Sequence, residues 1–315
     1  MSISEISNIV LPVFGLIGLG YLVAYLGILS EDTGDGLARF VFTIAVPVML
    51  FRTFATADIP DVAPWGLWIS YFTGIFLTWI LADLVVRKIF KREREAGVIA
   101  GVSAGYSNLV LICIPLTFTA FGEEGTVLLF LIIVVHLPVM MTISTVLFAR
   151  ADGEAISILA LALKIGRNLV LNPVIIGMFC GLAWRQTGLE LGDGALGKVV
   201  SQLGYAALPC ALFSMGMSLR KYGIRGNIGA GAAVSVLKLF FLPLVVWTMA
   251  EFVLGLPPLW VAVAVLGAAN PTGINAYLFA NHFNTGHGLA SNAITLTTAC
   301  AVLTIGMWLK ILGYG

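Results

Sequence analysis

Apolar stretches of roughly 20 residues, separated by short polar turns, run through the sequence from one end to the other. A helix of about 20 residues is about 30 Å long, which matches the hydrocarbon thickness of a bilayer. The pattern therefore predicts an all-α membrane protein with ten transmembrane helices. The predicted spans are 6–28, 36–56, 64–88, 97–121, 125–149, 168–187, 199–219, 228–254, 259–283 and 288–312.

The composition excludes most soluble protein classes. Only 10% of the 315 residues are charged and 59% are hydrophobic, whereas soluble domains carry about 25% charged residues. A net charge of +1 gives no basic field to attract nucleic acid, and no nucleic-acid-binding motif is present. The four cysteines have neither metal-ligand nor redox spacing, so we expect no metal and no cofactor.

The polar turns predict the orientation of the chain, because cytoplasmic loops are enriched in Lys and Arg. The basic residues that follow the third, fifth and seventh spans are Arg87, Lys88, Lys91, Arg92, Arg94, Arg150, Lys164, Arg167, Arg220, Lys221 and Arg225. The opposite loops hold mostly acids, such as Asp58, Asp61, Glu123 and Glu124, with Arg52, Arg185, Lys198 and Lys310 as the basic exceptions. We expect a multi-pass protein of the plasma (inner) membrane with both termini outside.

An internal repeat predicts the domain organisation. Pro12 and Gly20 recur as Pro173 and Gly181 at an offset of 161 positions, and Asn108 recurs as Asn270 at an offset of 162. Five helices in each half place the two halves in opposite orientations, as in many secondary transporters. We therefore expect two inverted repeats, residues 1–149 and 168–315. The connector 150–167 is expected to be short, cytoplasmic and amphipathic.

The fourth and ninth predicted spans contain residues that interrupt helices. The fourth carries Asn108 and Pro115, and the ninth carries Asn270 and Pro271 near its middle. Asn is a favoured N-cap and Pro a favoured first helical residue, so Asn270 and Pro271 predict a new helix start inside the membrane.

Paired helix starts predict an anion site. A helix start exposes backbone N–H groups and a partial positive charge, which together favour a negatively charged ligand. Asn108, Asn270, Thr272 and Asn275 add neutral donors and acceptors around the two interruptions. We therefore expect a small organic anion to bind between the fourth and ninth spans. The alternative is an ordinary proline kink that neighbouring helices satisfy.

Charged and titratable residues within the spans are few. Lys238 is the deepest cation, with a functional charge or simple lipid anchoring as the two interpretations. His136 is a candidate proton relay or a core histidine. Asp83 lies near the end of the third span, where it is either interfacial or part of coupling.

These residues together resemble the auxin efflux carrier family, specifically its bacterial members, some of which are malonate transporters. The resemblance covers the whole chain and rests on Val46–Pro47, the segment NLVLICIP from Asn108 to Pro115, and Asn172–Pro173. Lys238 with Pro243 and the segment PTGINAYLFA from Pro271 complete it.

The resemblance implies a mechanism. The two broken helices would cross at Pro115 and Pro271, and Asn108 and Asn172 would contact a substrate carboxylate. A unit of helices 3–5 and 8–10 would move against helices 1, 2, 6 and 7. The chain lacks the long cytoplasmic loop of the larger plant carriers and has Ala276 where they have a second proline, so a small carboxylate is expected rather than auxin.

Two other functions remain open from the sequence: an anion channel or sensory membrane module, and a membrane-embedded enzyme. Three scattered histidines and no central acid pair argue against an enzyme. Sodium, protons or the membrane potential would drive the transport. Lipid is the surrounding partner, and the oligomeric state, a homodimer included, is left open.

Overall fold

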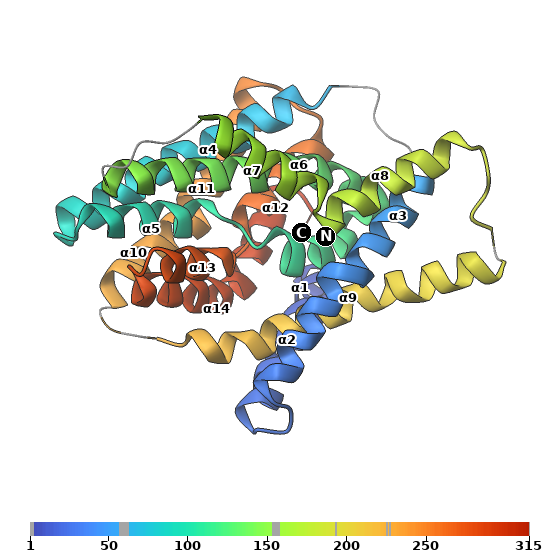
Figure 1. Ribbon diagram of the computed structural model, residues 1–315, viewed down its shortest axis with the longest axis horizontal. Helices are drawn as coiled ribbons and strands as arrows, with labels where there is room; N and C mark the ends of the chain where they lie inside the picture. The colour runs from blue at the N-terminus through green and yellow to red at the C-terminus, as the bar shows by residue number, and fades with distance from the viewer. Residues whose placement is uncertain are drawn as a thin grey trace.

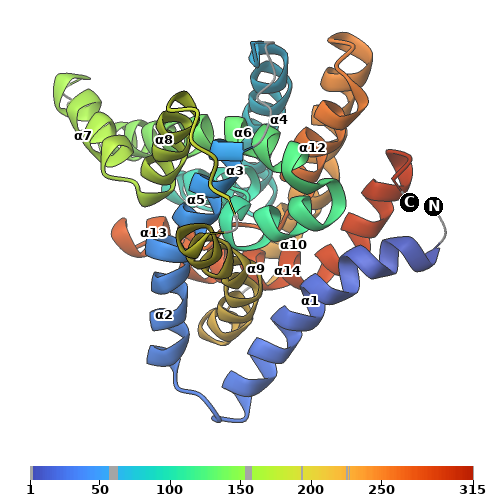
Figure 2. The same ribbon diagram turned by 90° about the vertical axis from the view of Figure 1, so that its right-hand side faces the viewer.

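The computed structural model describes residues 3–56, 63–152, 158–192, 194–224, 226 and 228–314. Within these ranges the chain is helical and forms no strand, apart from an isolated antiparallel bridge between Ser107 and Thr272. Figures 1 and 2 show a bundle in which helices from both halves of the chain interleave. The predicted all-α fold is confirmed for the described residues.

The helices of the first half carry five-residue π-helical segments, labelled η, between or after α-helical stretches. They are α1 (Ile3–Tyr25), α2 (Glu31–Phe40), η1 (Val41–Ala45), α3 (Val46–Thr56), α4 (Trp65–Leu84), η2 (Val85–Ile89), α5 (Arg94–Gly105), η3 (Leu109–Cys113) and α6 (Ile114–Asp152). Such π-helical turns often occur at functional sites.

The second half also contains both interrupted and continuous helices. It consists of α7 (Ile158–Val170), α8 (Pro173–Gln186), α9 (Ala195–Tyr222), α10 (Ile228–Val236), η4 (Leu237–Phe241), α11 (Leu242–Trp247), η5 (Thr248–Val253), α12 (Pro258–Ala269), α13 (Asn275–His282) and α14 (His287–Ile311).

Seven helices of the described chain are long and apolar enough to cross a membrane, or eight if the bent pair α7 and α8 is one span. The number of such helices is below the predicted ten partly because some predicted spans consist of two shorter helical segments. The fourth is interrupted between α5 and η3, and the ninth consists of the short helices α12 and α13. The fourth and fifth also run together in α6, where Gly122 alone leaves helical geometry with φ 65°.

The connector between the halves differs in extent from its prediction. The predicted connector, 150–167, overlaps α7, and the predicted span 168–187 begins inside that helix. The two helices α7 and α8 are bent by 58° at Leu171 and Asn172. Residues 153–157 of the connector, the acids Asp58 and Asp61 and the cation Arg225 lie outside the described residues.

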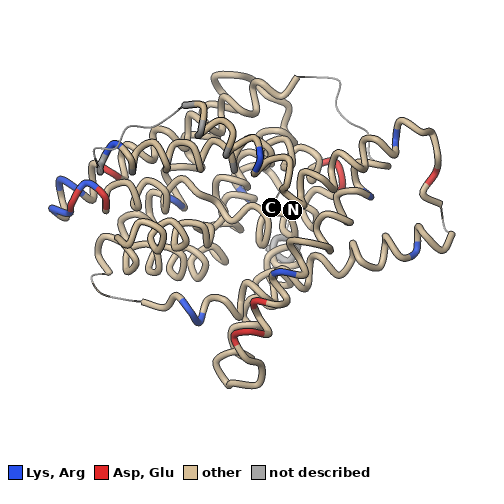
Figure 3. Tube along the Cα trace, viewed as in Figure 1, with Lys and Arg blue, Asp and Glu red and all other residues tan. Residues whose placement is uncertain are grey.

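Packing divides the helices into two groups. One group is α1, α2, α3, α8 and α9, and the other is α4, α5, α6 and α10 to α14. Small residues allow close approach in the first group: Gly177 and Gly181 of α8 lie against the α3 backbone at Pro47 and Phe51. Charged residues gather toward the ends of the helices, and the bundle interior is nearly free of them in the described chain (Figure 3).

Candidate functional site

The first interruption separates α5 from η3 at Tyr106, Ser107 and Asn108. Asn108 is the N-cap of η3, and its Oδ1 accepts a hydrogen bond of 3.2 Å from the backbone N–H of Leu111. Its Nδ2 donates to Sδ of Met215 in α9 at 3.3 Å. The side chain is buried, with 6% of its surface exposed. Asn108 therefore holds a helix start inside the bundle, as the sequence predicts.

The second interruption corrects the prediction for Asn270. This residue is not the N-cap of a new helix but the C-cap of α12, with extended backbone at φ −64° and ψ 150°. Its Nδ2 donates to the Leu266 carbonyl at 2.8 Å, one turn back in α12. Residues 271–273 stay outside helices, and α13 begins only at Asn275, with Ile274 as N-cap. Pro271 is therefore not the first helical residue.

The reason for this difference is that the two interruptions pair with each other. The Asn108 N–H donates to the Pro271 carbonyl at 2.9 Å, and the Gly273 N–H donates to the Tyr106 carbonyl at 2.7 Å. This antiparallel pairing requires extended backbone on both sides. Two broken helices thus satisfy part of each other's exposed backbone, which lipid cannot do.

Further bonds fix the paired segments in place. The Thr272 hydroxyl donates to the Ser103 carbonyl at 2.8 Å, and its N–H donates to Oγ1 of Thr297 in α14 at 2.9 Å. Gly273 is needed for the close approach, because a methyl group there would lie 3.0 Å from the Tyr106 ring. The crossing is therefore joined by hydrogen bonds to α5 and to α14.

A cavity of about 290 Å³ lies beside the crossing. Its lining comes from both interruptions, from the start of α8 and from α6. The lining residues are Phe42, Tyr106, Ser107, Asn108, Leu109, Val110, Ile133, His136, Asn172, Val174, Ile175, Gly273, Ile274, Asn275 and Leu278. It thus brings together four residues that the sequence singles out, Asn108, Asn172, Asn275 and His136, and the described residues of its lining include no acid.

The cavity collects unpaired donors from two helix starts. The backbone N–H groups of Val110, in the first turn of η3, and of Ile274 and Asn275, at the start of α13, have no acceptor among the described residues. These groups carry the partial positive charge of a helix N-terminus. The cavity is thus an uncharged but electropositive site.

Asn172 reaches the cavity from the other packing group. It is the N-cap of α8, and its Oδ1 accepts from the Val174 N–H at 2.9 Å. Because Oδ1 is used by the cap, the Nδ2 amide remains as the donor for a ligand. Asn108 and Asn172 therefore line one cavity from helices that belong to different groups.

Several predicted site residues lie away from this cavity. Asn270 and Thr272 are fully buried in the crossing and do not line it. Pro115 lies in α6, beyond η3, and does not belong to the paired segments, whereas Pro271 does. Asp83 pairs with Arg87 at 3.0 Å on the same helical stretch.

Lys238 and His136 lie close to the crossing. The Lys238 ammonium donates to Oγ of Ser107 at 2.5 Å and to the Ala268 carbonyl at 3.0 Å. The His136 ring lies 4.9 Å from the Tyr106 ring, centroid to centroid, and neither ring nitrogen has a partner among the described residues. The sequence reasoning missed Ser107, whose position next to Asn108 was the available signal.

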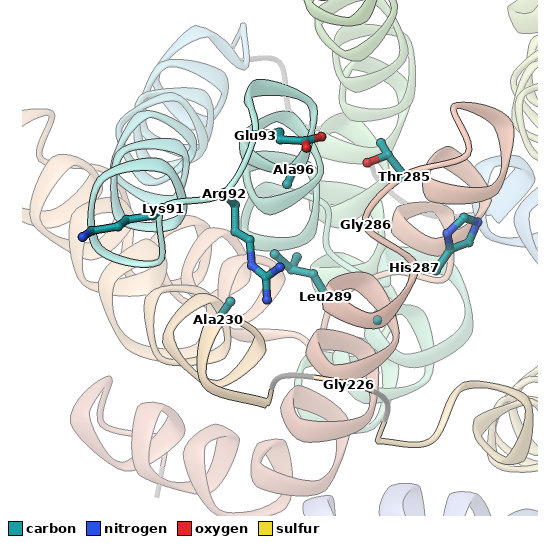
Figure 4. A pocket seen from close by; sticks show the side chains of 11 residues that line it. Lys91, Arg92, Glu93, Ala96, Gly226, Ala230, Thr285, Gly286, His287 and Leu289 are labelled. Carbon is teal, nitrogen blue, oxygen red and sulfur yellow. The ribbon is translucent and has the colours of Figure 1, made fainter.

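A second cavity, of about 450 Å³, lies at a charged end of the molecule, between the starts of α5, α10 and α14 (Figure 4). Arg92 extends toward its centre beside Leu289, while Lys91 points away. Glu93 brings the opposite charge into the same lining. None of the interruption residues lines it, so it is separate from the candidate site.

Comparison with known proteins gives matches along nearly the whole chain. Residues 5–309 match the family described as membrane transport protein. A protein of Rhizobium meliloti (strain 1021) named "Putative malonate transporter" is 27% identical over 305 residues, covering 96% of this chain and 94% of that protein. Auxin efflux carrier component 8 of Arabidopsis thaliana is 22% identical over 334 residues, covering 90% of this chain and 91% of the plant protein.

Proposed function

Because the chain belongs to the membrane transport protein family, the family of the auxin efflux carriers, we propose that it is a secondary carrier of a small organic anion. The family and its transporter-named relatives make the chain a transporter and not an enzyme. The proposal is carried by one observation: the starts of η3 and α13 meet at a cavity whose described lining has unpaired backbone donors and no acid.

Ten membrane crossings follow if each interrupted helix is one span. α5 with η3 and the beginning of α6 would be the fourth span, and α12 with α13 the ninth. Contacts between residues near the expected membrane surfaces support this topology. Lys221, at the end of α9, pairs with Asp35 of α2 at 2.6 Å, and both would have an inner position in this topology. The Phe121 ring lies 4.9 Å from the Tyr314 ring, and these two residues would be outside.

The same topology places both termini outside and relates the two halves as inverted repeats. The second cavity adds support, because the turns before α5, α10 and α14 would all be cytoplasmic and they meet there (Figure 4). The membrane in which the protein takes this orientation would be the plasma (inner) membrane.

The ligand of the cavity is inferred from its donors. Amide N–H groups at helix starts favour an anion, and the described residues of the lining supply no carboxylate that would favour an organic cation instead. Apolar lining from Val110, Ile133, Val174 and Ile175 fits the carbon part of an organic acid. A volume of about 290 Å³ is at the small end of ligand pockets.

These properties indicate a short mono- or dicarboxylate. Malonate is the first candidate, because a relative over almost the full length carries that substrate in its name. One carboxylate would lie between Asn108 and Asn172, near the N–H groups of Val110 and Asn275. His136, with two unpaired nitrogens, would donate from α6.

Movement would occur between the two packing groups. Asn172 belongs to the α1, α2, α3, α8 and α9 group, and Asn108 and Asn275 belong to the other group. A ligand bound between these residues would therefore contact both groups, and its binding would depend on their relative position. The membrane potential supplies about 2.3 kcal/mol per charge per 100 mV for net anion movement outward. A sodium or proton gradient is the alternative driving force.

Uptake into proteoliposomes tests the proposal. Labelled malonate, a longer dicarboxylate and a monocarboxylate are offered with imposed potentials, and malonamide serves as the uncharged control. We expect saturable, potential-dependent transport of at least one acid and none of malonamide. Transport of none of the acids, or equal transport of the amide, would contradict the proposal.

Variants at Asn172 test the site itself. Asn, Asp and Ser are similar N-caps, so Asn172→Asp and Asn172→Ser both retain the start of α8. Asp places a negative charge where the carboxylate is proposed to bind. We expect Asn172→Asp to reduce transport at least about tenfold relative to Asn172→Ser, since about 1.4 kcal/mol corresponds to a factor of ten. Equal rates would remove Asn172 from the site.

A further inference from the structure

A third cavity, of about 490 Å³, is a groove between α4, α5 and α6, and we call it the α4–α6 groove. On α4 and the adjoining η2, its lining residues fall at intervals of three and four positions from Phe72 to Arg87, so they share one face of the helix. On α6 the same spacing runs from Val139 to Arg150. Phe76 has 61% of its surface exposed, so the groove is open at the surface of the bundle.

The helices α4 and α6 run in the same direction along this groove. Near the beginning of α4, the Trp68 indole N–H donates to the Leu131 carbonyl of α6 at 2.7 Å. Further along both helices, a methyl group on Gly105 of α5 would lie 3.2 Å from Ile75 and 3.3 Å from Met140. The last groove residues of the two stripes, which are both arginines, therefore lie at the same end.

This charged end of the groove holds three arginines and one acid. Arg87 pairs with Asp83 at 3.0 Å. Arg94, the first residue of α5, lies at the same end, because Gly97 one turn later packs against the Asp83 and Arg87 side chains. The guanidinium groups of Arg94 and Arg150 have no hydrogen-bond or ion-pair partner among the described residues. Two positive charges are therefore left without compensation.

Membrane orientation alone does not explain this grouping of arginines. Lys and Arg gather where α5 begins (Figure 3), but Lys88, Lys91 and Arg92 do not line the groove. The cations of its described lining are all arginines, whose guanidinium groups bind a phosphate through two parallel hydrogen bonds. Arg94 also opposes the partial positive charge at the start of α5. A bound anion would offset both unfavourable charges.

The shape of the groove indicates that this anion carries an apolar chain. The apolar lining on α4 extends from Phe72 to Leu84, which is about 18 Å at about 1.5 Å per residue. One leaflet supplies a similar length, since the hydrocarbon core of a bilayer is about 30 Å thick. Basic pockets between membrane helices bind anionic lipid headgroups. A zwitterionic lipid would instead bring a further cation to a site that already has excess positive charge.

We propose that the α4–α6 groove binds one anionic glycerophospholipid, with its phosphate between Arg94 and Arg150 and an acyl chain along α4 and α6. The lipid belongs to the leaflet at the charged end, which is the cytoplasmic leaflet in the proposed topology. It joins three helices of one packing group and stabilises that group. The proposal concerns no carried substrate, so it holds or fails independently of the carrier function.

Thermal unfolding of the full-length protein in detergent tests the nature of the ligand. Dioleoyl phosphatidylglycerol, dioleoyl phosphatidylcholine or sn-glycerol 3-phosphate is added at equal concentration. We expect phosphatidylglycerol to raise the midpoint by at least about 2 °C more than either of the others does. Equal midpoints with the two lipids would overturn the proposal. An equal rise with glycerol phosphate would overturn it in favour of a soluble anion.

Two double variants with the same loss of charge locate the effect. Arg94→Gln with Arg150→Gln removes two cations from the groove, whereas Lys88→Gln with Lys91→Gln removes two from outside it near the same end. Gln is a good helix former, so both variants are expected to fold. We expect the first variant to lose the difference between the two lipids and the second to keep it. The same response in both variants would contradict the proposed site.

Native mass spectrometry tests the lipid preference without any variant. The full-length wild type is released from detergent that contains equal amounts of the two lipids. We expect one bound phosphatidylglycerol, retained at least about tenfold more often than phosphatidylcholine. Equal retention of the two lipids would overturn the proposal, even if a double variant failed to fold.

Discussion

The two interruptions at the centre of the bundle begin from matching asparagines and differ in what those residues do. Asn108 caps the helix that follows it and lines the cavity. Asn270, which the predicted repeat aligns with Asn108, caps the helix that precedes it, and its side chain bonds back to Leu266. Asn108 therefore lines a ligand space, whereas the side chain of Asn270 is enclosed by protein.

The difference shows that a sequence repeat does not imply two equivalent sites. The N–H groups that the second interruption offers to the cavity come from Ile274 and Asn275, four and five residues beyond Asn270. Pairing between residues 106–108 and 271–273 uses the intervening backbone. The site is consequently asymmetric: side-chain and backbone donors on the first side, backbone donors and Asn275 on the second.

Replacing each of the two asparagines by alanine tests most directly whether they differ in function. We expect Asn108→Ala to weaken carboxylate transport by about 10- to 100-fold, because a hydrogen bond to a charged group contributes about 1.5–3 kcal/mol. Asn270→Ala should leave KM nearly unchanged. The measurement is the concentration dependence of uptake in proteoliposomes, with protein in the membrane quantified for each variant.

The outcome decides between the asymmetric site and a symmetric one. If both variants raise KM equally, Asn270 belongs to the site and the difference between the interruptions has no functional meaning. Wild-type kinetics for Asn108→Ala would remove the first interruption from binding.

Replacing His136 tests whether this residue, which contacts Tyr106 of the first interruption, takes part in ligand binding. His136→Phe retains an aromatic ring against Tyr106 and removes two nitrogens that have no partner among the described residues. We expect about a tenfold rise in KM from the loss of one donor to a charged ligand. The thermal midpoint should not fall, because unpaired buried nitrogens contribute nothing to stability.

His282→Phe is the matched control, since His282 is exposed at the end of α13 and does not line the cavity. Its KM should equal that of the wild type. An unchanged KM for His136→Phe would make His136 a packing residue only.

The sequence predicted the general fold and several of the residues that meet at the cavity. Helical spans follow from hydrophobic length, and the interruptions follow from Asn108, Asn270 and Pro271, because these residue types are favoured at the ends and starts of helices. The helix start at Asn172 could also be predicted, since Asn followed by Pro is an N-cap pattern. The family likeness predicted that Asn108 and Asn172 share a ligand site, and they line the same cavity.

What the sequence could not give was which helix each asparagine caps. That choice depends on the pairing of Asn108 with Pro271 and of Gly273 with Tyr106, which joins residues far apart in the chain. The bond from Lys238 to Ser107 is equally non-local. The role of Pro115 in a crossing was inferred from likeness, whereas the paired segments lie at 106–108 and 271–273.

A methyl group at Gly273 tests whether the pairing holds the two interruptions together. Gly273→Ala would bring its Cβ to 3.0 Å from Tyr106 and 3.2 Å from the Ser107 carbonyl. We expect a loss of about 1–3 kcal/mol of stability, which is typical of overpacking, together with reduced transport. The midpoint of thermal unfolding in detergent measures the first effect.

Gly267→Ala provides the control in the same broken helix, because a Cβ there would lie 3.5 Å from its nearest neighbour. Its midpoint should stay close to that of the wild type. Equal midpoints for the two variants would mean that the close pairing of residues 106–108 with residues 271–273 does not contribute to the stability of the protein.

The smallest expected effect concerns the bond that fixes the second interruption to α14. Oγ1 of Thr297 accepts from the Thr272 N–H, whereas the hydroxyl of the adjacent Thr298 bonds only within its own helix, to Ile294. Thr297→Val should therefore leave a buried N–H unpaired and cost about 1–2 kcal/mol, while Thr298→Val should cost less. Hydrogen exchange at Thr272 and Gly273 measures the effect locally, and faster exchange in Thr297→Val than in Thr298→Val is expected. Equal exchange in the two variants would mean that pairing with the first interruption alone holds the second in place.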